Sequence, residues 1–163
     1  MSHPYLGLPP EDRTAGRPAA AARLRADRDL AARALAAALA IAPHLRERHD
    51  SQMLRLFLRD YDQHIEQLAR ALETGRDHWV AVHIASVVPI MRRRHVTMEE
   101  FGALWLGLRD ASVAILPGAD GEAVRSIVAA GIERLDRPAH LPGDRPRGRI
   151  TSFIWKAGGI GGW

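Results

Sequence analysis

Apolar residues recur at steps of three and four along most of residues 18–137, which is the pattern of helices that bury one face. The clearest apolar stripe lies in residues 53–72, with arginine and carboxylate side chains on the opposite face. Asp50 or Ser51 suits the cap at the start of this helix, and Gly75 follows its end. The pattern therefore predicts a long amphipathic helix between these signals.

An alanine-rich segment precedes that helix. Alanine is the best helix former, and a proline such as Pro18 is well tolerated at the first helical position. Pro43 lacks the backbone N–H that a helix interior needs, so it should end or kink the helix. One helix is predicted over residues 18–43.

The segment 78–94 is apolar on all sides rather than on one stripe. Such a helix usually lies in the middle of a bundle, so we expect it to be buried all round. Pro89 should kink it near Ala85, because proline removes one helical hydrogen bond.

Two further helices follow. Thr97 and Glu100 form the sequence of a capping box, and residues 116–118 (Leu-Pro-Gly) should stop the helix that it opens. Asp120 is expected to cap the last helix. The chain is thus predicted to be all-α, with about five helices in one bundle over residues 18–137. Residues 1–17 are expected to form a flexible arm, and residues 138–163 an irregular tail.

The positive charge is concentrated in that tail. The chain has 163 residues and a formal net charge of +4, but residues 1–136 carry 18 arginines against 18 carboxylates. Residues 137–163 carry four arginines and Lys156 against Asp144 alone. A neutral body without a recognition motif argues against nucleic acid as a partner.

The tail combines basic, aromatic and glycine residues, which supports more than one interpretation. As a docking segment for a protein partner, it would steer with its basic side chains and anchor with its large apolar ones. As a substrate, it would be the core peptide that other enzymes modify, with residues 1–148 as the leader peptide. A disordered end is the third interpretation. The residues expected to contact a partner are Arg145, Arg147, Arg149, Phe153, Ile154, Trp155, Lys156 and Trp163.

Several classes of chemistry are excluded or disfavoured. The chain has no cysteine, so disulfides, thiolate nucleophiles and cysteine-ligated metals are excluded. No apolar run is long enough for a transmembrane segment, and the first residues do not resemble a signal peptide, so we expect a cytoplasmic protein. No residues can be assigned acid, base or nucleophile roles, so we expect no enzyme activity. The sequence is compatible with a homodimer.

Four residues are candidates for a ligand site. His64 and His83 lie in register with apolar stripes, Trp79 lies one turn before His83, and His95 follows three arginines. The histidines are either hydrogen-bonded residues at the edge of the core or polar groups in a small-molecule pocket. No histidine and carboxylate spacing indicates a metal site.

The order of helices and their corner residues resembles a known superfamily. The residues that carry the resemblance are 56–60, 72–75, 83–87 and 96–101. They resemble the globin superfamily, especially bacterial sensor globins and the haem-free globin domains of stressosome proteins, over roughly residues 24–136. In that family a buried helix carries the histidine that binds haem, which would be expected near residues 88–91. None of these is histidine; His83 lies a turn or two earlier and His95 lies in the corner.

The leading hypothesis is a non-catalytic globin-like domain that binds a partner or senses a small ligand, with the tail as its docking segment. Because no histidine lies at residues 88–91, we expect a haem-free domain without a cofactor. The first alternative is the precursor of a ribosomally made modified peptide, and the second is a haem-binding globin.

Overall fold

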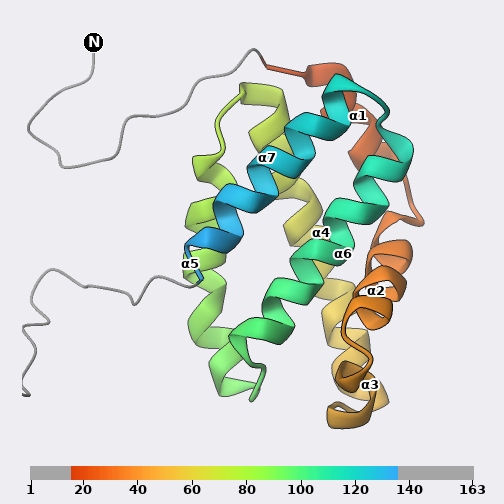
Figure 1. Cartoon of the computed structure of the whole chain (residues 1–163), viewed down its shortest axis with the longest axis vertical. Helices are drawn as coiled ribbons and strands as arrows, with labels where there is room; N and C mark the ends of the chain where they lie inside the picture. Colours follow the sequence, from red (N-terminus) through yellow and green to blue (C-terminus); the bar gives the residue numbers. More distant parts are fainter. Residues whose placement is uncertain (1–15, 136–163) are drawn as a thin grey trace, which may run out of the picture.

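The structure is a computed structural model of the chain, and it describes residues 16–135. These residues form seven α-helices and no strand (Figure 1). The tail and most of the expected arm, including every predicted partner-binding residue, lie outside the described residues. The helices are α1 (Pro18–Ala26), α2 (Leu30–Ile41), α3 (His44–Arg48), α4 (Ser51–Thr74), α5 (His78–Arg93), α6 (Met98–Ile115) and α7 (Ala119–Glu133).

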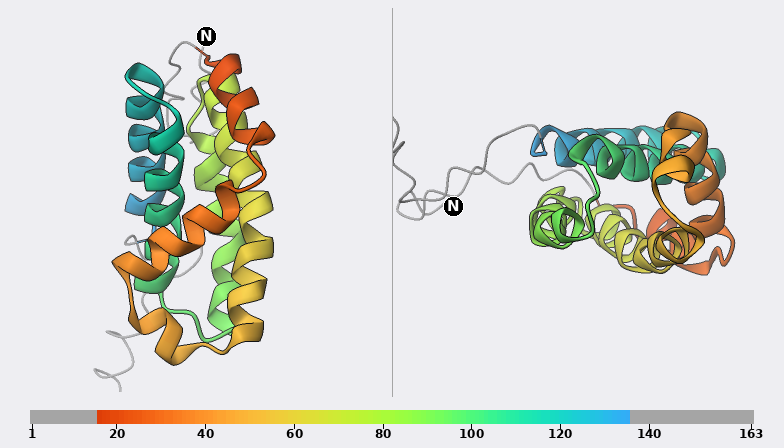
Figure 2. Two further views of the ribbon diagram at one scale, coloured as in Figure 1. Left: turned by 90° about the vertical axis from the view of Figure 1, so that its right-hand side faces the viewer. Right: turned by 90° about the horizontal axis from the view of Figure 1, so that it is seen from below.

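The helices pack in two layers. α6 and α7 form one layer and α4 and α5 the other, and α1 to α3 close one side of the molecule (Figure 2). α2 crosses α6 in the most extensive helix–helix contact of the described residues, and α1 packs along α4 (Figure 2). The all-α prediction is confirmed for these residues.

The predicted number of helices is wrong, because the alanine-rich segment forms more than one. Asp27 has an extended backbone (φ −84°, ψ 101°), and its side chain accepts hydrogen bonds from the Asp29 amide and from Arg33. These polar contacts hold a break between α1 and α2 that alanine propensity cannot reveal. Pro43 does end α2, but its own helical φ of −58° also suits it to lead directly into α3.

Most predicted helix ends are confirmed. The Asp50 side chain accepts a hydrogen bond from the Met53 amide, and Gly75 ends α4 in the left-handed conformation, with φ 66°. Thr97 and Glu100 form both hydrogen bonds of the capping box. The prediction for Asp120 is wrong: Gly118 precedes α7, and Asp120 lies in its first turn and pairs with Arg17.

The prediction that α5 is buried all round is also wrong. α5 packs through a single face that includes Val80, Ile84 and Met91, and it runs on through Pro89. On the opposite face Val82 is 60% exposed and Ile90 is 36% exposed. α5 therefore lies at the edge of the bundle, with only α4 and α7 as extensive neighbours.

The core lies between the two layers and contains large aromatic side chains. Trp105 and Phe101 from α6 and Phe57 and Tyr61 from α4 are almost fully buried. The Tyr61 hydroxyl donates a hydrogen bond to the Leu104 carbonyl oxygen at 2.7 Å, which satisfies its polar atom. Tyr61, Phe101 and Trp105 of this cluster lie around His64, one of the two histidines described next.

None of the described helices is both long enough and apolar enough to pass through a lipid bilayer.

Candidate functional site

Two histidines from facing helices meet inside the bundle. The Nδ1 atom of His64, on α4, lies 2.8 Å from the Nε2 atom of His83, on α5. His64 is 2% exposed, whereas His83 is half-buried. One of these two nitrogens must donate and the other accept, so the contact is a hydrogen bond between neutral rings or between a neutral and a charged ring.

Aromatic rings enclose His64. It stacks on Trp105 with ring centroids 5.0 Å apart, and the edges of Tyr61 and Phe101 lie at 5.8 Å and 6.0 Å. Its other nitrogen, Nε2, and the Trp105 Nε1 atom are buried and have no hydrogen-bond partner among residues 16–135. Buried polar atoms without partners are costly. Four other buried side-chain atoms of the described residues also lack a partner, among them Ser112 Oγ on α6.

The surroundings favour the neutral form of both rings. Burial, together with the charge that His83 would carry, lowers the pKa of His64 to about 3. Burial also lowers the pKa of His83, although the nearby Asp60 carboxylate works in the opposite direction. Asp60 is itself paired with Arg94, whose Nη1 lies 2.6 Å from its Oδ2. At neutral pH the pair is therefore uncharged.

The structure brings together two of the four candidate ligand residues. Trp79 lies one turn from His83, but its contacts are with the His78 ring and with the guanidinium of Arg70, 4.7 Å from its ring centroid. His95 lies at the exposed corner between α5 and α6 with φ 59°. Trp79 and His95 thus lie outside the contact between His64 and His83.

The contact bears directly on haem, which the globin resemblance raises as a ligand. Two histidines on opposite sides of one metal ion place their nitrogens about 4 Å apart, since each metal–nitrogen bond is about 2 Å long. His64 and His83 are closer than that and bond to one another. In this conformation the two rings cannot both ligate a haem iron placed between them. Among residues 16–135, no three metal-binding side chains lie close enough to hold an ion.

A buried carboxylate stabilises the end of the molecule near this pair. Glu100 is fully buried, and it accepts hydrogen bonds from the Thr97 amide and from Arg48, both at 2.8 Å. Burial by itself raises the pKa of this carboxyl, but the Thr97 amide, His49 and Arg48 together lower it below its usual value. The ionised carboxylate therefore connects α3 to the start of α6.

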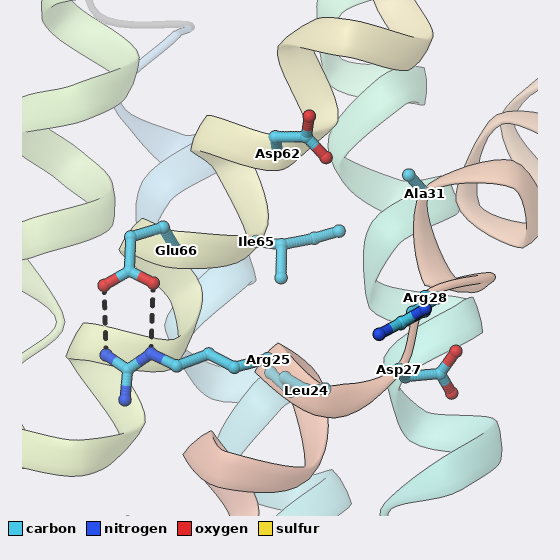
Figure 3. A pocket seen from close by; sticks show the side chains of 8 residues that line it. All are labelled: Leu24, Arg25, Asp27, Arg28, Ala31, Asp62, Ile65 and Glu66. Carbon is cyan, nitrogen blue, oxygen red and sulfur yellow. Dashed lines mark hydrogen bonds and ion pairs between the residues drawn. The ribbon is translucent and has the colours of Figure 1, made fainter.

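A cleft lies on the outer side of α4, opposite to the histidine pair. Its volume is about 480 Å³, and it is lined by residues from α1, α2, α4 and the turn between α1 and α2 (Figure 3). Arg25 closes one side by a bidentate ion pair with Glu66, with both N···O distances 3.0 Å. Ile65 points into the cleft, between the Asp62 carboxylate and the Arg28 guanidinium (Figure 3).

Sequence reasoning did not find this cleft. Arg28 lies in the break between α1 and α2, and Asp62 lies on the polar face of α4, where a charged side chain is usual. The only local signal was the run Asp27-Arg28-Asp29 inside an alanine-rich segment.

Comparisons with protein-family models, with curated proteins and with solved structures found no match.

Proposed function

We propose that this chain is a non-catalytic, globin-like domain that senses a small ligand, and that its tail docks a protein partner. The observation that carries the sensing function is the hydrogen bond between His64 and His83 across the interface of α4 and α5. It is a polar contact inside an aromatic cluster, at a position where only two facing helices need to move apart to break it.

The helix order supports the globin-like part of the proposal. A one-turn helix led by proline, α3, separates α2 from α4, and α4 and α5 face the pair α6 and α7. Globins pack helices pairwise around a pocket in a comparable way. Here aromatic side chains and the two histidines fill the space between α4, α5 and α6.

The histidine pair supports sensing because it has two distinct states. While α4 and α5 are in contact, each ring satisfies one nitrogen of the other. If they separate, the His64 ring loses the one hydrogen-bond partner that it has among the described residues, which costs free energy unless water or a ligand replaces it. A ligand that binds one arrangement better than the other shifts the balance between them.

The first test is a haemin titration of the purified full chain, followed by absorption spectroscopy. We expect no shifted Soret band, because the two rings bond to each other and cannot both ligate an iron placed between them. A shifted band in the wild-type chain that is lost in both His64→Leu and His83→Leu would show a haem-binding globin and overturn this proposal. His95→Asn is the matched control, because it changes a histidine outside the pair.

The second test concerns the tail. We expect the tagged full chain to retain specific partners in its native host, and the triple variant Phe153→Ala, Trp155→Ala and Trp163→Ala to lose them by at least about tenfold, since aromatic anchors dominate such contacts. Quantitative mass spectrometry of the captured proteins gives the comparison. Unchanged capture by the triple variant would contradict docking through the tail. An intact mass that shows a modified or shortened C-terminus would instead support the precursor alternative.

A further inference from the structure

The cleft on the outer side of α4 holds one free positive and one free negative side chain. Among the charged residues that line it, Arg25 pairs with Glu66 and Glu73, and Asp27 pairs with Arg33. Arg28 and Asp62 have no hydrogen bond and no ion pair with any described residue. Both are exposed, and Figure 3 shows them on either side of Ile65.

The balance of charges around the cleft selects against simple ions. Two guanidinium groups and three carboxylates line it. An anion such as phosphate would be attracted by Arg28 but repelled by the carboxylates of Asp62, Asp27 and Glu66. A cation would be attracted by Asp62 but repelled by both arginines. A molecule that carries one charge of each sign, a few bonds apart, can satisfy Arg28 and Asp62 together.

The rest of the lining is apolar. Leu24 is fully buried beneath the cleft, and Ala31 and Ile65 are partly buried beside it. The volume of about 480 Å³ lies within the range of small-ligand sites. An apolar side chain that covers Ile65 and Ala31 would remove their remaining surface from water.

We propose that this cleft binds a free α-amino acid with an apolar side chain. Its carboxylate would pair with Arg28, which can accept it in a bidentate geometry, and its ammonium group would pair with Asp62. This inference rests on the proposed sensing function and names its ligand class. Because Asp62, Ile65 and His64 lie within one turn of α4, a ligand on the outer face of α4 would act on the helix that carries the histidine pair.

The experiment is isothermal titration calorimetry of the full chain with L-leucine, N-acetyl-L-leucine and L-leucinamide. The second ligand lacks the ammonium group and the third lacks the carboxylate. We expect L-leucine to bind at least about tenfold more tightly than either analogue, since each loses one charged contact. Arg28→Gln and Asp62→Asn should each weaken L-leucine binding by a similar factor. Arg23→Gln, an exposed arginine of α1 outside the cleft, is the control and should bind as the wild type does.

Two results would overturn the amino-acid site. One is equal binding, or no binding at millimolar concentration, of L-leucine and its two analogues. The other is tight L-leucine binding that neither Arg28→Gln nor Asp62→Asn weakens. A parallel titration with NMR detection of the ¹⁵N-labelled imidazole groups separates this inference from the proposed function. Binding without a change in the His64 and His83 signals would leave the site in place but remove the histidine pair as its sensor.

Discussion

Gly107→Ala should destabilise the domain by at least about 2 kcal/mol, although alanine normally stabilises a helix relative to glycine. Gly107 lies on α6 where α2 crosses it. A Cβ atom there would lie 2.6 Å from the Ala38 backbone nitrogen and 2.8 Å from the Ala38 Cβ atom, and closer still to the Ala34 carbonyl oxygen. Backbone atoms of a helix cannot rotate away, so the two helices must separate along their most extensive contact.

Urea unfolding followed by circular dichroism measures this loss, with Gly102→Ala as the matched control. Gly102 lies on the same helix, but among the described residues no heavy atom outside its own stretch of helix lies within 4 Å of the position that its Cβ would occupy. The same added methyl group should therefore stabilise the chain there by about 0.5–1 kcal/mol. The explanation by close helix contact fails if both variants change the free energy of unfolding in the same direction.

Features that depend on neighbouring residues could be predicted from the sequence. The Asp50 cap, the capping box of Thr97 and Glu100 and the left-handed Gly75 are confirmed because each needs only a few adjacent residues to form. The break between α1 and α2 was missed because the polar run that makes it, residues 27–29, also fits the exposed face of a continuous helix.

Features that depend on how helices pack could not be predicted in the same way. The apolar residues of α5 indicate a buried helix, yet the bundle supplies neighbours for only one of its faces, and Val82 stays exposed. The sequence indicates that His64 and His83 are either residues at the edge of the core or polar groups in a ligand pocket, but their contact depends on the relative rotation of α4 and α5. Arg28 and Asp62 lie on a common cleft only because α1 packs along α4.

Lowering the pH from about 6.5 towards 4.5 should destabilise the wild-type chain more than the variant His64→Phe. In the unfolded chain a histidine takes up a proton near pH 6.5, whereas the folded His64, with its pKa lowered to about 3, stays neutral. The unfolded state then binds more protons, so acid favours it. For this one group the free energy of unfolding stays constant above pH 6.5. Below pH 6.5 it falls by about 1.4 kcal/mol for each pH unit.

The groups around His64 determine which part of the pH range is diagnostic. The lowered pKa of His83 also makes acid destabilise the folded chain. The Asp60 carboxylate, which is paired with Arg94, reduces this lowering of the His83 pKa. The carboxylates with lowered pKa values, Glu66 and Glu100, add their own loss only below about pH 4.5, where unfolded carboxyls take up protons.

The measurement is the free energy of urea unfolding at half-unit intervals between pH 7.5 and pH 4.5. Phenylalanine keeps a ring stacked on Trp105 but takes up no proton. The free energy of unfolding of His64→Phe should therefore fall less steeply as the pH is lowered, by the slope that corresponds to about one bound proton. His95→Asn changes a histidine on an exposed corner, outside the pair, and is the control for the loss of a histidine in general. Parallel curves for the wild type and His64→Phe would mean that folded His64 takes up its proton at the same pH as the unfolded chain, near pH 6.5. The hydrogen bond to His83 would then tolerate a charged ring just below neutral pH, and burial would not hold the pair in its neutral form.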